Sequence, residues 1–351
     1  MINYCIKKSV FGVSILLGVV TLLFFLFQVL PGDPVSMMMG QRSDIATRQS
    51  IEKELGLDQP LINRYFYYLN DISPLSFHKN TEANEVKYNY TKVISGASTA
   101  FVIKAPYLGR SYQSDRLVSK IIPEYAAGSL WLALVSIAFA SVVGIALGVV
   151  SAWNKNSWAD RLAIFLSTLG ISAPSFVTGI FISILLGGVL AAYTGLSMTG
   201  SLWEIDAIRG KHLEVKNIIL PALTLGIRPL AIITQLTRSA VLDVLNQDYI
   251  RTAKAKGLSN FQVVYNHVLK NALNPVITAV SGWLASLLAG SFFVEFIFSW
   301  KGLGIVTIQS VMKLDYPVVI GTALFIALIF VVITLAVDIL YAIVDPRIRY
   351  E

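Results

Sequence analysis

Charged side chains that fall inside apolar segments are the residues of this sequence best placed to do chemistry. Glu295 and Asp338 are the carboxylates of this kind, and Arg228 is a basic counterpart in another apolar segment. Ionisable groups inside a membrane often belong to proton relays, which need several such groups in the protein core. Glu295 and Asp338 instead lie near the ends of their segments, where each can reach an interface. We therefore expect them to be paired or hydrated, and keep proton-coupled transport as an alternative.

The sequence contains no recognisable catalytic or ligand-binding motif. Gly210-Lys211-His212 is followed by Leu213, so it is not a phosphate-binding loop, and no other stretch matches one. The three histidines, His78, His212 and His267, are scattered along the chain, and Cys5 is the only cysteine. A disulfide within the chain and a cysteine-based metal cluster are therefore excluded. We expect a protein that is not an enzyme and has no cofactor or metal.

A basic segment between two apolar runs, residues 248–275, predicts a helical hairpin. Asn246 or Asp248 can cap a short first helix, and Gly257 can end it in a left-handed turn. The run from Ser259 to Gln262 matches a capping box that opens a second helix. That helix leads to Pro275, which should start or kink the next apolar segment.

The first helix of this hairpin is too short to be stable alone, so it must pack against something. Tyr249 and Ala253, four residues apart, give it an apolar ridge that suits a groove on a partner protein. The alternative is an ordinary basic loop that lies on anionic lipid. The candidate contact residues of the hairpin are Asp248, Tyr249, Ile250, Arg251, Thr252, Ala253, Lys254, Ala255, Lys256 and Gly257.

The composition places these residues in an integral membrane protein. Of the 351 residues, 55% are hydrophobic and 14% are charged, and several apolar runs are long enough to cross a bilayer. The net charge of +7 arises largely from Lys and Arg beside the apolar runs, where they contact membrane lipid and set orientation. No basic stripe with interleaved aromatic residues is present, which argues against nucleic-acid binding.

About six membrane-spanning helices are expected. The apolar runs that predict them cover residues 10–30, 129–153, 162–192, 218–236, 276–298 and 318–344. The first run is too long for a signal-peptide core and has no cleavage site, so it reads as a retained span. In the fourth run Arg228 and Pro229 interrupt the apolar pattern. The arginine should face protein or water, unless the helix is tilted and its side chain reaches the interface.

An even number of spans places both termini on one side, and basic residues mark that side as cytoplasmic. The residues that carry this bias are Lys7, Lys8, Lys155, Arg161, the basic residues from Arg238 to Lys270, Arg347 and Arg349. The bias is incomplete, because several basic residues fall on the opposite side. These are Arg209, Lys211, Lys216, Lys301 and Lys313.

The chain divides on this basis into three parts: residues 1–30 with the N-terminus and first span, an external region at 31–127, and a transmembrane domain at 128–351 that includes the loop 238–275. In the external region Asp58-Gln59-Pro60 predicts a helix start, and the aromatic run 65–68 suits a helix at the membrane interface. Strand-like runs at 85–94 and 99–103 predict a small hairpin within 77–107.

The hairpin resembles the coupling-loop motif of ABC importer permeases, in the form typical of the dipeptide, oligopeptide and nickel subfamily. Arg251, Thr252 and Ala253 hold the places of the Glu-Ala-Ala of the general motif, and the resemblance continues from His267 to Pro275. Further blocks of the same subfamily follow in order along nearly the whole chain. They are Pro31-Gly32-Asp33-Pro34, residues 55–61, residues 220–226, Lys301-Gly302-Leu303-Gly304, Asp315-Tyr316-Pro317 and Asp345-Pro346-Arg347-Ile348.

This resemblance implies an all-α permease of the type I arrangement, with an enlarged external loop between its first two helices. It further implies an inner-membrane subunit that imports dipeptides or oligopeptides. The expected partners are a second, similar permease, two cytoplasmic ABC ATPases and an external binding protein. Residues 248–257 would then contact an ATPase. Nickel or another small solute stays open as the substrate, and a proton-coupled secondary transporter is the alternative mechanism.

Overall fold

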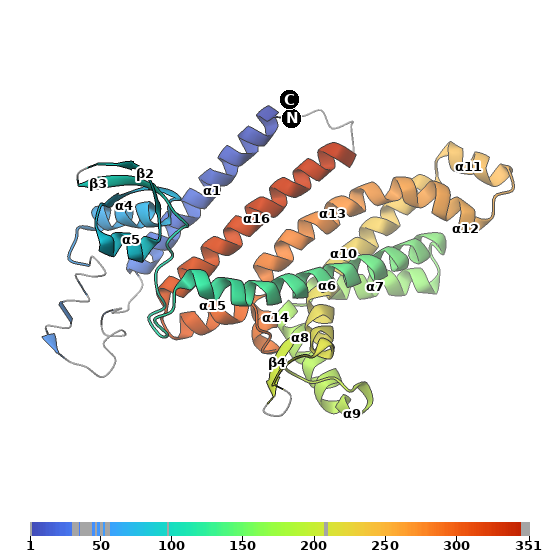
Figure 1. Ribbon diagram of the computed structural model, residues 1–351. Helices are drawn as coiled ribbons and strands as arrows, with labels where there is room; N and C mark the ends of the chain where they lie inside the picture. Colours follow the sequence, from blue (N-terminus) through green and yellow to red (C-terminus); the bar gives the residue numbers. More distant parts are fainter. Residues whose placement is uncertain are drawn as a thin grey trace. The chain divides into compact units, whose positions relative to one another are not determined.

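The computed structural model describes residues 2–29, 35, 44–45, 48–49, 52, 57–96, 98–206 and 210–344 (Figure 1). The blocks at 31–34 and 345–348, and the Leu55-Gly56 start of another, lie outside these residues, as do Arg209, Arg347 and Arg349. The chain forms two compact units. The first comprises Met1–Lys8, Tyr125–Ile305 and Ile329–Glu351, and the second comprises Ser9–Glu124 and Val306–Leu328.

Helices dominate the described chain, with two small sheets beside them. The α-helices are α1 (Ile2–Val29), α4 (Leu61–Ile72), α5 (Glu82–Tyr88), α6 (Val118–Trp153), α7 (Trp158–Ser172), α8 (Ser175–Ile182), α9 (Ala191–Thr194), α10 (Ile219–Leu245), α11 (Asp248–Ala255), α12 (Asn260–Val263), α13 (Leu269–Gly290), α14 (Phe292–Ile297), α15 (Leu303–Met312) and α16 (Tyr316–Val344). The π-helical turns are η1 (Ser183–Val189) and η3 (Val264–Val268), and η2 (Val215–Ile218) is a 3-10 turn. The strands are β1 (Leu75–Lys79), β2 (Thr91–Ser95), β3 (Thr99–Ile103), β4 (Trp203–Asp206) and β5 (Gly210–Leu213).

Among the described residues, five helical segments are long and apolar enough to cross a membrane, and a bent pair of helices makes a sixth if the pair is counted as one span. The five are Lys7–Phe27, Val118–Trp153, Val215–Leu245, Asn260–Ala289 and Tyr316–Asp338. The sixth consists of Trp158–Ser172 and Ser175–Val189, which meet at an angle of 109°. The prediction of about six spans in a helical membrane protein is therefore confirmed.

Two predicted spans have the wrong limits. The predicted continuous span 162–192 breaks after α7, because Pro174 forces the preceding Ala173 into an extended conformation with ψ of 129°. The predicted span 276–298 also has other limits: α13 begins at Leu269, continues through Pro275 and ends at Gly290, so this proline does not start the helix. Spanning helices tolerate proline where neighbouring groups satisfy the freed backbone carbonyl.

The core of the first unit forms where α10 packs against α7, α8 and α13. Glycines on α6 allow a close approach to the same helix. A Cβ on Gly148 would lie 2.5 Å from the Thr237 Cβ, and a Cβ on Gly144 would lie 2.9 Å from the Ile233 side chain. The backbone of α6 can therefore contact side chains of α10, because glycine at these positions has no side chain.

A fully buried carboxylate organises the loop between α14 and α15. Glu295 is 0% exposed, so the expectation that it reaches an interface is wrong. Its Oε1 accepts hydrogen bonds of 2.6 Å from the hydroxyls of Ser129 and Ser291. Its Oε2 accepts bonds from the backbone amides of Gly304, at 2.6 Å, and Ile305, at 3.3 Å. Four donors compensate the removal of this carboxylate from water.

The close approach to Glu295 explains both glycines in the Lys301-Gly302-Leu303-Gly304 block. A Cβ on Gly302 would lie 2.4 Å from Glu295 Oε2, and a Cβ on Gly304 would lie 2.5 Å from the Phe292 Cα. The same loop donates the Trp300 indole N–H to the Gly128 carbonyl at 3.0 Å. Any side chain at these glycines would separate the amides from the carboxylate.

Asp338, the second carboxylate of interest, forms an ion pair with Lys8 at 2.8 Å. The expected pairing of Asp338 is therefore confirmed. Together with the Glu295 network, it shows that both candidate proton carriers have structural partners.

In the second unit, strands β1, β3 and β2 form an antiparallel sheet in that order. The β2–β3 pair confirms the predicted small hairpin, but β1 was not predicted, and residues 85–88 are helical rather than extended. Helix α5 forms there because the Thr81 hydroxyl caps its start and Asn89, with φ of 45°, adopts the left-handed conformation that ends it. A further hairpin, β4–β5, was also missed.

Helix α4 begins immediately after Pro60, close to the predicted start, and packs on α1. The Tyr65 hydroxyl lies 2.7 Å from that of Thr21, and the Tyr68 ring lies 5.5 Å from the ring of Phe24.

Also in this unit, Asp315 accepts hydrogen bonds from the Ser111 hydroxyl and the Tyr112 amide. This buried acceptor gives the Asp315-Tyr316-Pro317 block its structural role.

We expect Gly302→Ala and Gly304→Ala to lower the melting temperature and the yield of folded protein, since each Cβ would displace Glu295 or the backbone beside it. Gly282→Ala is the matched control, because its Cβ would meet nothing within 4 Å and alanine favours a helix. Melting of detergent-solubilised protein measures the effect. If Gly302→Ala and Gly304→Ala melt at the same temperature as the control, the loop does not depend on the close approach of its backbone to Glu295.

Candidate functional site

The predicted helical hairpin is present as α11, a tight turn and α12. Helix α11 spans Asp248–Ala255, but its N-cap is Gln247, which forms no capping side-chain bond. The prediction that Asn246 or Asp248 caps the helix is thus wrong. Asp248 lies in the first turn, where its negative charge interacts favourably with the positive end of the helix dipole. Its backbone carbonyl accepts a bond from the Thr252 hydroxyl at 3.1 Å.

The turn has the predicted geometry. Gly257 has φ of +78°, and its amide donates to the Lys254 carbonyl at 3.0 Å. The next helix opens with the predicted capping box, in which the side chains of Ser259 and Gln262 each accept a backbone N–H bond from the other residue. Two local signals therefore fix the direction of the chain as it returns to the membrane-spanning helices.

The hairpin is held by its own chain, through a different face from the one predicted. Ile250 is 0% exposed and Ala253 is 5% exposed, whereas Tyr249 is 43% exposed. The predicted Tyr249–Ala253 ridge is therefore not the packing face. Ile250 and Ala253 instead pack in a buried apolar cluster. Its members are Ala152, Val241, Ile250, Ala253, Val263, Val268 and Ala272. Within the chain, the Tyr249 hydroxyl accepts a hydrogen bond from the Asn271 side chain at 3.0 Å.

The opposite face of α11 is exposed, and most of its charges are basic. Its exposed members are Asp248, Tyr249, Arg251, Thr252, Lys254 and Ala255, followed by Lys256 and Gly257. The Arg251–Asp248 contact of 3.4 Å joins side chains that are 75% and 95% exposed, so it adds little stability. A helix with one face anchored and the other free presents a firm surface to a partner.

Sequence reasoning missed an aromatic pair beside this surface. The rings of Phe261 and Tyr265 stack with centroids 6.0 Å apart, although the residues are 77% and 66% exposed. Their spacing of four residues, directly after the capping box, is the signal that could have indicated a shared face. Exposed aromatic residues of this kind are common at protein interfaces.

A buried ion pair supports the base of the hairpin. The Arg238 guanidinium donates two hydrogen bonds to Asp160, with Nε–Oδ1 at 2.6 Å and Nη2–Oδ2 at 2.9 Å. The Ser151 hydroxyl also donates to Oδ1, and the Asn156 amide donates to Oδ2 at 2.8 Å. The pair joins α7 to α10 and to the end of α6. Ser151 is followed by Ala152, which belongs to the buried apolar cluster that holds α11. The ion pair therefore lies next to that cluster.

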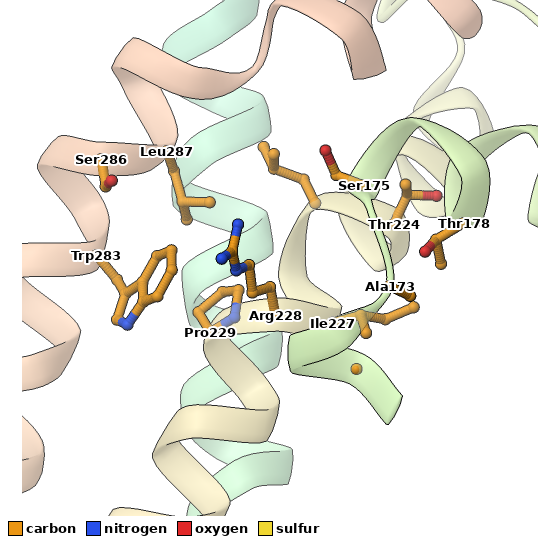
Figure 2. Close-up of a pocket in the computed structure, with 12 residues that line it drawn as sticks. Ala173, Ser175, Thr178, Thr224, Ile227, Arg228, Pro229, Trp283, Ser286 and Leu287 are labelled. Atoms are coloured by element: carbon orange, nitrogen blue, oxygen red, sulfur yellow. The ribbon is translucent and has the colours of Figure 1, made fainter. Parts of the chain in front are cut away.

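A pocket with a volume of about 140 Å³ lies in the same unit, among residues of α7, α8, α10 and α13 (Figure 2). Arg228 lines it, which agrees with the prediction that this side chain faces protein or water. Ala173 and Gly170 also contribute to its wall. The interruption of the apolar pattern at Arg228 and Pro229 therefore coincides with a cavity.

Among the described residues, no group of His, Cys, Asp and Glu side chains could hold a metal ion. Glu295, Asp338 and Asp160 are each engaged in the contacts given above. The geometry offers an anchored hairpin with an exposed basic face and a cationic pocket between helices.

Comparison with known protein families covers almost the whole chain. Residues 144–350 match the family described as binding-protein-dependent transport system inner membrane component. Residues 1–133 match the N-terminal part described for the same transport-system membrane components.

Curated relatives match over the full length of both proteins. The chain is 32% identical to a dipeptide transport system permease protein of Alkalihalophilus pseudofirmus and 35% identical to a glutathione transport system permease protein of Shigella flexneri, with 100% of each chain covered. Its fold is similar to that of a chain in an inward-facing structure of the MetNI methionine ABC transporter. That match has a TM-score of 0.50 and 17% identity, and covers 65% of this chain and 97% of the other.

Asp160→Asn should destabilise the protein by about 3 kcal/mol, because breaking a buried pair leaves the Arg238 charge without its carboxylate. The estimate is at the lower end of the usual range because the Arg238 side chain is 22% exposed. Thermal melting in detergent measures the change. The control is Arg161→Gln, an exposed neighbour on α7.

The double variant Asp160→Asn/Arg238→Gln should recover part of the loss, since the uncompensated charge is removed. If Asp160→Asn melts together with the wild type, the ion pair does not support the hairpin base.

Proposed function

Because this chain belongs to the family of inner membrane components of binding-protein-dependent transport systems, we propose that it is a permease subunit of an ATP-driven peptide importer. It is a multi-pass membrane protein and a transport subunit, not an enzyme. Membership in the family implies an ATPase partner and a substrate-binding protein. Within such a system, this chain provides part of the path across the membrane.

The observation that carries the proposal is the anchored hairpin at α11. Its buried face, formed by Ile250 and Ala253, fixes the helix to the ends of the spanning helices. Its exposed face, from Asp248 to Gly257, is the surface for an ATPase. A movement of the ATPase would pass through the packed cluster into α10 and α13, because rigid contacts transmit displacement. The hydrogen bond between Tyr249 and Asn271 also connects α11 to α13.

The arrangement we propose has both termini and the hairpin on the cytoplasmic side. The partners are a second, similar permease, two cytoplasmic ABC ATPases and an external binding protein, with lipid around the spans. The domain division is residues 1–30, an external region at 31–127 and the permease domain at 128–351. Basic residues at Lys7, Lys8 and the hairpin support this orientation.

Peptides are the substrate class that the relatives support. One full-length relative is described as a dipeptide permease and another as a glutathione permease, and glutathione is itself a small peptide. These names favour a short peptide over nickel or another small solute. The external binding protein would make the first selection of the substrate.

A proton-coupled secondary transporter is not favoured by the contacts of the acidic residues. Glu295 accepts four hydrogen bonds and Asp338 pairs with Lys8, so neither is arranged as a carrier. The energy for transport must then come from a partner. The candidate hairpin is the part of this chain that can receive it.

Gly257→Val should weaken recovery of the ATPase with this chain and reduce ATP-dependent uptake. A β-branched residue at φ of +78° is strained by about 1–2 kcal/mol or more, while a Cβ there would meet nothing within 4 Å. The effect therefore comes from the turn and not from a clash. Gly257→Asn is the matched control, since asparagine tolerates this conformation. Normal ATPase recovery and uptake by Gly257→Val would contradict the coupling role.

In vesicles that contain the complete transporter, dipeptide uptake should require ATP and should continue when an uncoupler collapses the proton gradient. Radiolabelled dipeptide with the binding protein outside the vesicle measures this directly. Uptake that disappears with the gradient while ATP stays high would favour the secondary-transport alternative instead.

A further inference from the structure

The pocket beside Arg228 combines a fixed positive charge with several hydroxyl groups. Ser175 and Thr178 come from α8, Thr224 and Arg228 from α10, and Trp283 from α13. In Figure 2 the Arg228 guanidinium lies between Trp283 on one side and Ser175 and Thr224 on the other. The charged end of the side chain is thus directed into the pocket.

The positive charge of this pocket is not balanced within it. No acidic residue is among those that line the pocket, and no described acidic side chain forms an ion pair with Arg228. An arginine within a membrane-spanning helix is costly unless it faces water or an anionic group. The pocket is therefore suited to an anion that enters from solution.

The break between α7 and α8 adds a second favourable feature. Because the chain turns at Pro174, α8 begins at Ser175 on the pocket wall, and no side chain caps this start. The amides of Val177 and Thr178 already donate to the Pro174 carbonyl, but the helix dipole still favours negative charge at this start. Broken spanning helices in other transporters present such ends to substrate carboxylates.

An unsatisfied hydroxyl provides an independent sign of a ligand. Thr224 lines the pocket and is 2% exposed, yet its Oγ1 has no hydrogen-bond partner among the described residues. Leaving a buried hydroxyl without a partner is unfavourable. A ligand oxygen at the pocket wall would supply one.

We propose that Arg228 binds the C-terminal carboxylate of a peptide during its passage through the membrane, with Ser175 and Thr224 as further hydrogen-bond donors. The inference rests on the proposed peptide import. A guanidinium can donate two parallel bonds to a carboxylate, which an ammonium cannot do. The volume of about 140 Å³ holds several waters or the charged end of a peptide, so the rest of the substrate would extend beyond the pocket.

The test compares a dipeptide with its C-terminal amide in vesicles that contain the complete transporter and the wild-type binding protein. Arg228→Gln should reduce uptake of the free-acid dipeptide about tenfold, because a charge-assisted contact is lost. Uptake of the amide, where the wild type transports it, should change less than about twofold on the same grounds. Arg228→Lys, which keeps the charge but not the two parallel bonds, should recover part of the free-acid uptake.

Arg161→Gln is the control, because Arg161 is an exposed arginine on α7 that does not line the pocket. All variants are compared at equal amounts of assembled transporter. This separates loss of substrate contact from loss of folding or assembly.

Undiminished free-acid uptake by Arg228→Gln would overturn the proposal, as would an equal loss of free acid and amide or a failure of lysine to recover any uptake. If the wild type transports peptide in each of these cases, peptide import itself stands. If the wild-type transporter takes up neither peptide, the substrate class is wrong, and the carboxylate site falls with it.

Discussion

The bidentate ion pair between Asp160 and Arg238 is the interaction on which the candidate coupling region depends most. A carboxylate that is 1% exposed would be strongly unfavourable alone, and two guanidinium bonds with bonds from Ser151 and Asn156 satisfy it. These contacts fix the ends of α6, α7 and α10 to each other. The apolar cluster that holds α11 begins directly beside them. The exposed face of the hairpin therefore has a firm base, which a part that transmits movement requires.

The same rule governs the other carboxylates that the fold removes from water. Glu295 is surrounded by two hydroxyls and two amides, and two glycines are needed to bring the loop close enough. Asp338 is paired with Lys8. Acidic groups in this chain thus stabilise structure instead of carrying protons. Arg228 is different, because it lines a pocket without a carboxylate, and this contrast led us to assign it to the substrate.

Local signals in the sequence were reliable where one residue or one turn decides the conformation. Gly257 has the expected left-handed geometry, and Ser259 with Gln262 forms the expected capping box. Apolar runs located the spans, but they did not reveal the break at Pro174, because the two helices on either side of it form one continuous apolar run in the sequence. Contacts between distant residues were not predictable from pattern. Asp160 and Arg238 are 78 positions apart, and β1 pairs with β3 across an intervening helix and strand. The role of Asp248–Gly257 rests on family resemblance together with the exposed face of α11.

Site-directed crosslinking at Ala255 tests the central claim most directly. Cys5, the only native cysteine, is first replaced by serine, and a cysteine is introduced at exposed Ala255 in the complete transporter. The same change at Val86, which is 84% exposed in α5, is the control. The account predicts a crosslink from position 255, and not from position 86, to a chain with a phosphate-binding loop, identified by mass spectrometry. An intact transporter in which position 255 crosslinks to no ATPase would contradict it.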